Sequence, residues 1–240
     1  MKLAPSPRTR SILRETYYKS VPSLIRSFFR GKRRDAVFQQ AMQQFLQDPG
    51  ACASPGNPIL TDLIYGWGNE AWSAMDEYLA SCIDYALKSN GPILECGSGL
   101  STILLGAIAK RQGQRHWVLE HKPAWATKVQ HHLNNYQLDS VVCTKPLKDY
   151  GDFCWYDVPL DRMPDNFFLV VCDGPPRRTK GGRYGLVPTM RERLKSGCVI
   201  LLDDAYREAE LKIAKRWGAE LDTSFAIQGI SKPYIKMVVT

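Results

Sequence analysis

A glycine-rich turn flanked by acidic residues is the clearest chemical signal in the chain. The segment Glu95-Cys96-Gly97-Ser98-Gly99-Leu100-Ser101-Thr102 follows an apolar run and opens a helical pattern. Glycines at 97 and 99 let the backbone turn sharply and approach a ligand closely, and the start of a helix offers free N–H groups. Glu120 ends the next apolar run, 23 residues beyond Gly97, where a carboxylate can accept both hydroxyls of a ribose. Together these elements favour a nucleotide-type cofactor site over an ordinary strand-to-helix turn.

Three further carboxylates follow two other apolar runs. Asp173 comes directly after 167–172, and Asp203 and Asp204 come directly after 198–202. Ligands of open α/β sheets bind beyond the carboxyl ends of the strands, so we expect these acids to converge on one crevice with the glycine turn. A hard divalent ion such as Mg²⁺ would relieve their mutual repulsion and lower the pKa of a bound hydroxyl. Without a metal, Asp173 would orient cofactor or substrate, and Asp203 or Asp204 would cap the next helix.

Strand-length apolar runs alternate with helical periodicity through most of the chain. The expected strands are 93–96, 116–120, 141–143, 167–172 and 198–202, and the expected helices are 70–87, 102–109, 123–134, 189–195 and 206–217. This order predicts a doubly wound, Rossmann-like α/β fold with a parallel sheet covered on both faces. The runs 224–227 and 234–239 have no helix between them and predict an antiparallel pair at the sheet edge.

With these motifs in place, the sequence resembles the class I S-adenosylmethionine-dependent methyltransferases. The resemblance covers roughly residues 90–240, including the closing strand pair that distinguishes their seven-stranded sheet from nicotinamide-binding domains. It implies S-adenosylmethionine as cofactor, with Gly97 and Gly99 near its methionine portion and Glu120 on its ribose. Ser101 departs from the family, because many members have a third glycine there. The cofactor-binding residues implied in this way are Glu95, Gly97, Ser98, Gly99, Ser101 and Glu120.

The acids resemble those of the catechol O-methyltransferase type, in which residues after the fourth and fifth strands hold a metal that binds the substrate oxygens. This resemblance implies Asp173, Asp203 and Asp204 as ligands of Mg²⁺, and Asp173 and Asp204 as catalytic residues. Asp204 departs from the asparagine that is common in that family. The Asn/Asp-Pro-Pro-aromatic turn of amine-methylating nucleic-acid enzymes is missing, so we expect an oxygen acceptor.

The loop after Pro176 carries four cations and three glycines, in the segment 177–185. A basic loop over the crevice suits an anionic small-molecule substrate, although a solvated loop without a specific partner would look the same. Short similarities of 173–176 and 202–207 to methyltransferases that act on sugar hydroxyls favour a sugar-like acceptor.

Two other functions stay open. The glycine turn with Glu120 also suits a nicotinamide-dependent oxidoreductase, although Thr102 stands where G-x-G-x-x-G requires its third glycine. The chain could alternatively be a non-catalytic Rossmann-like module recruited through a basic N-terminal arm.

That arm, residues 1–35, contains ten Lys and Arg residues and two acids, which accounts for the whole net charge of +8. The other residues carry 22 bases and 22 acids, so nucleic acid is not an expected partner of the body. Apolar residues at 21, 24, 25, 28 and 29 predict a basic amphipathic helix. Such a helix packs on the body, binds a membrane surface or partner groove, or serves as a transit peptide.

Residues 36–69 are expected to hold a helix capped by Asp35 and a linker or lid, followed by a methyltransferase domain at 70–240. The turn-forming run 50–58 is the expected linker, and the segment 65–69 is a candidate lid over the cofactor. Seven cysteines without a C-x-x-C pair, and a start without a secretory signal, predict a cytoplasmic protein with reduced thiols. Attachment at a membrane surface through the arm is compatible with that expectation.

Overall fold

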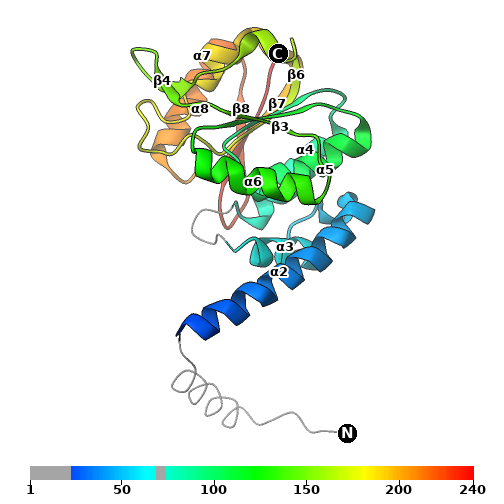
Figure 1. Ribbon diagram of the computed structural model, residues 1–240. Coiled ribbons are helices and arrows are strands. Elements are labelled where there is room, and N and C mark those ends of the chain that lie inside the picture. The colour runs from blue at the N-terminus through cyan, green and yellow to red at the C-terminus, as the bar shows by residue number, and fades with distance from the viewer. Residues whose placement is uncertain (1–22, 69–73) are drawn as a thin grey trace, which may run out of the picture.

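A seven-stranded sheet forms the centre of the computed structural model, which describes residues 23–68 and 74–240 (Figure 1). The strand order is β3-β2-β1-β6-β7-β9-β8. Strands β3, β2, β1, β6 and β7 pair in parallel, and β9 is antiparallel to both β7 and β8. The strands are β1 (Ile93–Cys96), β2 (His116–Glu120), β3 (Val141–Thr144), β6 (Phe167–Cys172), β7 (Leu194–Leu202), β8 (Phe225–Gln228) and β9 (Tyr234–Val238). The predicted Rossmann-like sheet and its closing antiparallel pair are confirmed.

The central strands are buried on both faces, which is why they have continuous apolar sequences. Ile93 of β1 belongs to the core on one side, whereas Leu94 and Cys96 belong to the core on the other. On the first side lie α4 (Asp76–Lys88), α5 (Leu100–Gln112) and α6 (Pro123–Asn135). On the second side lie α7 (Leu186–Met190) and α8 (Glu208–Leu221) (Figure 1). This arrangement brings the carboxyl ends of β1, β2, β6 and β7 to one edge.

The helix expected at 189–195 is wrong in its bounds. Helix α7 ends at Met190, the 3₁₀ helix η3 covers Arg191–Arg193, and β7 has already begun at Leu194. The other 3₁₀ helices of the described residues are η1 (Pro49–Cys52) and η2 (Leu160–Arg162). The helix expected at 70–87 corresponds to α4, which begins at Asp76. Residues 69–73 lie outside the described residues.

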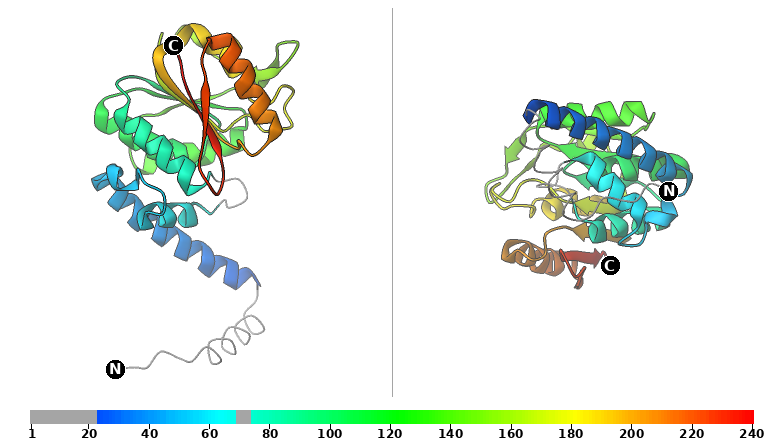
Figure 2. Two further views of the ribbon diagram at one scale, coloured as in Figure 1. Left: turned by 180° about the vertical axis from the view of Figure 1, so that it is seen from behind. Right: turned by 90° about the horizontal axis from the view of Figure 1, so that it is seen from below.

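Helix α2 (Ser23–Gln47) is one continuous element, so the expectation that a helix begins at a cap on Asp35 is wrong. The periodicity on either side of Asp35 belongs to the same helix. Apolar residues at 38, 41, 42, 45 and 46 give the second half of α2 a helical apolar spacing, and four of them, Phe38, Ala41, Met42 and Phe45, are buried against the body, whereas Leu46 is exposed. The first half of α2 extends away from the body (Figure 2). Residues 1–22 of the predicted arm lie outside the described residues.

Helix α3 (Pro58–Trp67) was not expected, because it begins inside the run of turn-forming residues. Asn57 caps it by accepting a hydrogen bond from the N–H of Ile59 at 2.9 Å, and Pro58 takes the first helical position, where no N–H is needed. Trp67, from the candidate lid at 65–69, is buried with the core under α2. The described part of the candidate lid, Tyr65 to Gly68, therefore forms the end of a packed helix. Asn69 lies outside the described residues.

A separate hairpin, β4 (Leu147–Asp149) with β5 (Cys154–Tyr156), also escaped the sequence analysis. Three-residue strands are too short to show an alternation of apolar and polar residues. Trp155 and Tyr156 are completely buried on the α8 side of the sheet. The hairpin is joined to the basic loop by a hydrogen bond from the N–H of Cys154 to the carbonyl of Lys180, at 2.9 Å.

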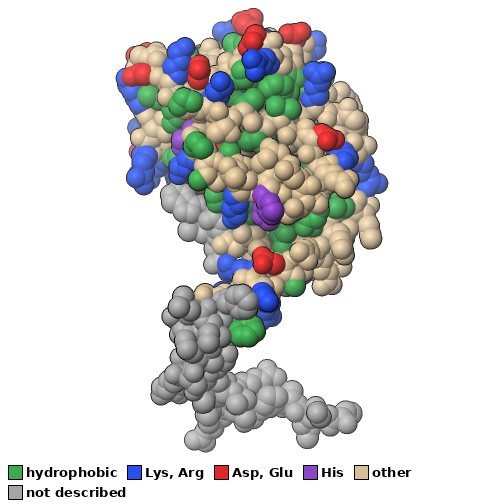
Figure 3. Space-filling view, in the orientation of Figure 1, with side chains coloured by type: hydrophobic (Ala, Val, Ile, Leu, Met, Phe, Trp, Pro, Cys, Tyr) green, Lys and Arg blue, Asp and Glu red, His purple; other side chains and the backbone are tan. Residues whose placement is uncertain are grey.

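One face of the body carries charges of both signs side by side (Figure 3). Figure 3 shows Lys, Arg, Asp and Glu side chains intermingled on the face that carries α6, without one dominant basic patch. In the described ranges, no helix combines the length and the apolar composition needed to cross a membrane.

Candidate functional site

The glycine turn and the turn after β6 are packed directly against each other. The N–H groups of Asp173 and Gly174 both donate to the carbonyl of Cys96, at 3.0 and 2.7 Å. Gly97 has a φ of 87°, and a Cβ added there would lie 2.9 Å from the nitrogen of Gly174. A Cβ on Gly174 would collide with Gly97 and with the hydroxyl of Tyr156. Both glycines are therefore required for close backbone contact, and the sequence analysis found only the first of them.

Gly99 differs, because a Cβ added there would meet nothing within 4 Å. It stands immediately before α5, where its N–H donates to Oγ1 of Thr102 at 2.9 Å. The open side of Gly99 and the first turn of a 13-residue helix thus leave room for a ligand beside unpaired N–H groups. This is the part of the predicted turn that a cofactor can approach.

Glu120 is placed as predicted, at the end of β2 beside the glycine turn, and is 4% exposed. Its Oε2 accepts hydrogen bonds from the N–H of Ser98 at 3.1 Å and from Oγ of Ser98 at 2.7 Å. Its Oε1 accepts from the N–H groups of His121 and Lys122, both at 2.8 Å. A carboxylate offers about four acceptor positions, so this one is saturated. The Ser98 hydroxyl occupies one of these acceptor positions.

Glu95 is buried, with 1% exposure, and its carboxylate supports the glycine turn through Ser101. Its Oε1 accepts a hydrogen bond from Oγ of Ser101 at 2.5 Å, and its Oε2 lies 3.3 Å from Nε2 of His116. Nδ1 of His116 in turn contacts Oγ of Ser140 at 2.9 Å. The structure therefore brings Ser101 and Glu95 together as a buried polar pair. The sequence analysis did not connect His116 and Ser140 with them, since neither follows a motif.

Trp125, in the first turn of α6, also reaches the glycine turn. Its indole N–H donates to the carbonyl of Ser98 at 2.6 Å. The ammonium of Lys128 lies 4.7 Å from the ring centroid of Trp125 and 4.7 Å from that of Trp67. These contacts tie α3 and α6 to the turn.

The three predicted acids do converge. One oxygen from each of Asp173, Asp203 and Asp204 lies within 4.8 Å of the others, and we call these residues the acid cluster. Asp204 adopts φ of 66°, a left-handed conformation that aspartate and asparagine tolerate better than most residues. Asp203 and Asp204 are buried, whereas 34% of the Asp173 side chain is exposed. Asp173 is thus the member that a substrate can reach.

Arg183 lies inside the acid cluster, which corrects its expected place in a solvated basic loop. It is 2% exposed, and its Nη2 contacts Oδ1 of Asp173 at 2.8 Å and Oδ2 of Asp204 at 2.7 Å. It also donates to the carbonyls of Asp203 and Asp173, both at 2.8 Å. The other three cations of the loop, Arg177, Arg178 and Lys180, are exposed.

Two further cations border the acid cluster. Nζ of Lys232, from the turn between β8 and β9, lies 2.7 Å from Oδ2 of Asp203 and 3.0 Å from Oδ1 of Asp204. Nη1 of Arg207 lies 2.6 Å from Oδ2 of Asp204. The sequence did not indicate that either cation contacts the acid cluster. Lys232 is remote from it in sequence, and Arg207 was noted only as part of the segment 202–207.

The surrounding charges and burial shift the pKa values of Asp173 and Asp204 in opposite directions. Burial raises the pKa of Asp173 to about 7, and Asp203 and Asp204 act in the same direction, against the opposing effect of Arg183. Burial alone would raise the pKa of Asp204 as well, but Arg183 and Lys232 outweigh it and hold that pKa below its usual range. Asp173 can therefore exchange a proton near neutral pH, while Asp204 stays ionised.

The acid cluster does not fit a resident metal ion. Mg²⁺ requires a nearly octahedral set of oxygen ligands. Here the nitrogens of Arg183 and Lys232 lie among the carboxylate oxygens that would supply them.

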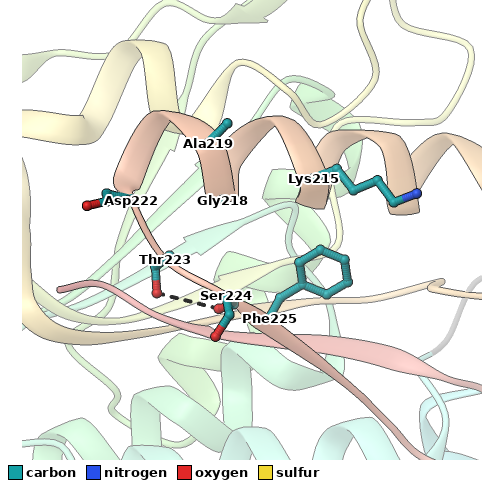
Figure 4. A pocket seen from close by; sticks show the side chains of 7 residues that line it. All are labelled: Lys215, Gly218, Ala219, Asp222, Thr223, Ser224 and Phe225. Carbon is teal, nitrogen blue, oxygen red and sulfur yellow. Dashed lines mark hydrogen bonds between the residues drawn. The ribbon is translucent and has the colours of Figure 1, made fainter.

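A shallow pocket lies elsewhere, between the end of α8 and the start of β8 (Figure 4). It is lined by Lys215, Gly218, Ala219, Asp222, Thr223, Ser224 and Phe225. None of the predicted site residues belongs to this lining, so we assign no function to it.

No family model and no curated protein matches this sequence. Solved structures do match. The SAH-bound methyltransferase PaMTH1 of Podospora anserina is 13% identical, with a TM-score of 0.54, over 100% of this chain and 99% of that chain. A branched-chain polyamine synthase mutein of Thermus thermophilus, in complex with N4-aminopropylspermidine and 5'-methylthioadenosine, is 14% identical, with a TM-score of 0.50, over 77% of this chain and 64% of that chain. An SAH-bound O-methyltransferase of Bacillus cereus is 14% identical, with a TM-score of 0.48, over 96% of this chain and 97% of that chain.

The sheet order and the likeness to PaMTH1 define the fold. The chain has the fold of the class I S-adenosylmethionine-dependent methyltransferases. The expected fold is confirmed, and identities of this size establish the fold alone.

Proposed function

We propose that the protein is an S-adenosylmethionine-dependent methyltransferase that methylates an oxygen of a small acceptor. The observation that carries this proposal is the convergence, at one edge of a methyltransferase-type sheet, of three features. These are the open glycine turn, Glu120 at the end of β2, and the partly exposed carboxylate of Asp173 at the end of β6. Ligands of doubly wound sheets bind at this edge.

The residues present fit the cofactor. The open side of Gly99 and the start of α5 would receive its methionine portion, and Glu120 would receive its ribose when the Ser98 hydroxyl gives way. Ser101 and Glu95 would act from beneath by holding the turn in shape. When bound, S-adenosylmethionine supplies a methyl group on a positively charged sulfur. The work of the protein is then to hold an acceptor oxygen in line with that group.

Asp173 would act as the general base. Its carboxylate is partly exposed and is held in one orientation by Arg183, at 2.8 Å. It would take the proton that the acceptor hydroxyl loses as the oxygen is methylated, and it would later release that proton to solvent. Asp204, also predicted as catalytic, is buried among three cations, so we assign it a positioning role through Arg183.

The exposed cations of the loop support an anionic or sugar-like acceptor. Arg177, Arg178 and Lys180 are all exposed close in sequence to the base Asp173. A phosphate or carboxylate on the acceptor would form charge-assisted hydrogen bonds with such side chains. The acid cluster itself has little to offer a cationic acceptor, because its charge is already matched by internal cations.

The basic arm is the proposed attachment site for a membrane surface or a protein partner. In its described part, Arg30, Lys32 and Arg33 are exposed on the extending half of α2, and Phe29 is 59% exposed. Basic residues next to an apolar side chain on a helix are typical of interfacial helices.

The test is calorimetric titration of the purified protein with S-adenosylhomocysteine, 5'-methylthioadenosine and NAD⁺ in separate runs. We expect binding of S-adenosylhomocysteine in the micromolar range and no binding of NAD⁺, since β9 interrupts the all-parallel order of nicotinamide domains. The Glu120→Ala variant is the matched control for a site-specific signal. Folded protein that binds NAD⁺ alone, or none of the three, would refute the proposal. Preference for 5'-methylthioadenosine would redirect it to aminopropyl transfer.

A further inference from the structure

The acid cluster has the composition of a divalent-cation site, but a guanidinium nitrogen lies at its centre. Nη2 of Arg183 is 2.8 Å from Oδ1 of Asp173 and 2.7 Å from Oδ2 of Asp204. A nitrogen within hydrogen-bonding distance of both carboxylates occupies the space that an ion bridging them would need.

Most of the remaining carboxylate oxygens are engaged as well. Oδ2 of Asp203 and Oδ1 of Asp204 lie 2.7 and 3.0 Å from Nζ of Lys232. Oδ1 of Asp203 accepts from the N–H of Asp204 at 2.7 Å. Of the six carboxylate oxygens in the acid cluster, only Oδ2 of Asp173 takes part in none of these contacts. A hard divalent ion, which takes six or more oxygen ligands, therefore finds no ready set here.

Both cations are built into the fold rather than resting on its surface. Arg183 is 2% exposed, and its donation to the carbonyls of Asp173 and Asp203 joins the ends of β6 and β7. Lys232 belongs to a turn in which three successive N–H groups donate hydrogen bonds to the carboxylate of Glu77. Glu77, in the first turn of α4, accepts from Ile230 at 2.9 Å, from Ser231 at 2.8 Å and from Lys232 at 3.3 Å. The fold thus holds Arg183 and the backbone of Lys232 by contacts additional to those with the acid-cluster carboxylates.

We propose that Arg183 and Lys232 hold the place of a divalent cation, so that this protein keeps its acid cluster ordered without binding a metal. Within the proposed function, they supply the fixed positive charge beside Asp173, and methylation proceeds without Mg²⁺. The metal-binding part of the inference does not depend on which reaction the protein catalyses.

The experiment is a titration with Mn²⁺, which prefers the same oxygen ligands as Mg²⁺ and loses its free-ion electron paramagnetic resonance signal on binding. Wild-type protein is expected to bind no Mn²⁺ up to about 1 mM, the weak end of carboxylate sites. Lys232→Met removes one cation and keeps the apolar stem, and should bind Mn²⁺ at least about tenfold more tightly than wild type, because two carboxylate oxygens are released. Arg183→Met should gain more. Lys148→Met, which removes an exposed cation outside the acid cluster, is the matched control and should gain nothing.

Two results would overturn the proposal. One is wild-type binding of Mn²⁺ with a Kd below about 1 mM that is lost in Asp204→Asn. The other is a folded Lys232→Met protein without any gain, and this variant decides the question alone if Arg183→Met does not fold. A failure to bind S-adenosylhomocysteine would count against the methyltransferase proposal and leave the Mn²⁺ result unchanged, so the two failures are distinguishable.

Discussion

Replacing Ser98 by alanine should strengthen cofactor binding, although Ser98 lies in the glycine turn. Glu120 already accepts four hydrogen bonds, two of them from Ser98. A ribose hydroxyl can reach Oε2 only by displacing Oγ of Ser98, which lies 2.7 Å away. This exchange breaks one charge-assisted hydrogen bond between Ser98 and Glu120. Part of the lost free energy is recovered when the serine hydroxyl forms a hydrogen bond with water.

The net cost of that exchange is about 1 kcal/mol, within the usual range for one hydrogen bond. Ser98→Ala should therefore bind S-adenosylhomocysteine about fivefold more tightly than wild type. Glu120→Gln removes the charge that both ribose hydroxyls would use, and should weaken binding about 10- to 100-fold, the equivalent of about 1.5–3 kcal/mol.

The assay is isothermal titration calorimetry at constant ionic strength, with melting curves to show that each variant is folded. Ser54→Ala, which alters an exposed serine away from the turn, is the control for losing a hydroxyl and should match wild type. Tenfold weaker binding by Ser98→Ala would refute the reasoning and make the Ser98 hydroxyl a direct ligand of the cofactor. Equal affinities of Glu120→Gln and wild type would remove Glu120 from the ribose site.

Three further outcomes are expected. Asp173→Asn should lower turnover about 10²- to 10⁴-fold while cofactor affinity stays within a few-fold, and wild-type kcat/KM should rise with pH through about 7 as Asp173 becomes a base; a pH profile unchanged in the variant would contradict this. Arg183→Met should lose about 3–5 kcal/mol of stability in urea unfolding, because Asp204, 4% exposed at its side chain, is left with less compensation; a loss below about 1 kcal/mol would show that the pair is not a stabilising element. The lowered pKa of Glu77, caused chiefly by the N–H of Ile230, means that its carboxylate stabilises the fold above its ordinary pKa of 4.5 and loses that effect as the pH falls below it. Glu77→Gln should therefore melt below wild type at pH 7, with the difference shrinking in acid; a difference independent of pH would contradict the charge argument.

Local sequence determined the sheet and the glycine turn. The strand at 167–172 is six apolar residues buried on both faces, and any chain with that composition between two turns gains by burying it. The glycines at 97 and 99 and the acid at 120 act through backbone freedom and strand-end position, which short stretches of sequence encode. The starts and ends of helices were less well encoded. The helix through Asp35 shows that a good capping residue does not start a helix when the helical pattern already runs through it.

Only the tertiary structure decided how the acid cluster is neutralised. Arg183 stands in a loop with three similar cations, and nothing in the residues beside it distinguishes the one that becomes buried. Lys232 meets Asp203 across 29 positions, and Glu77 reaches Ile230 across 153. Pairings of this kind depend on how β9 is placed beside β7 and on how α4 packs across the sheet. A charge interacts through space with whichever group the fold brings near it. The residues next to it in sequence therefore do not indicate which group that is.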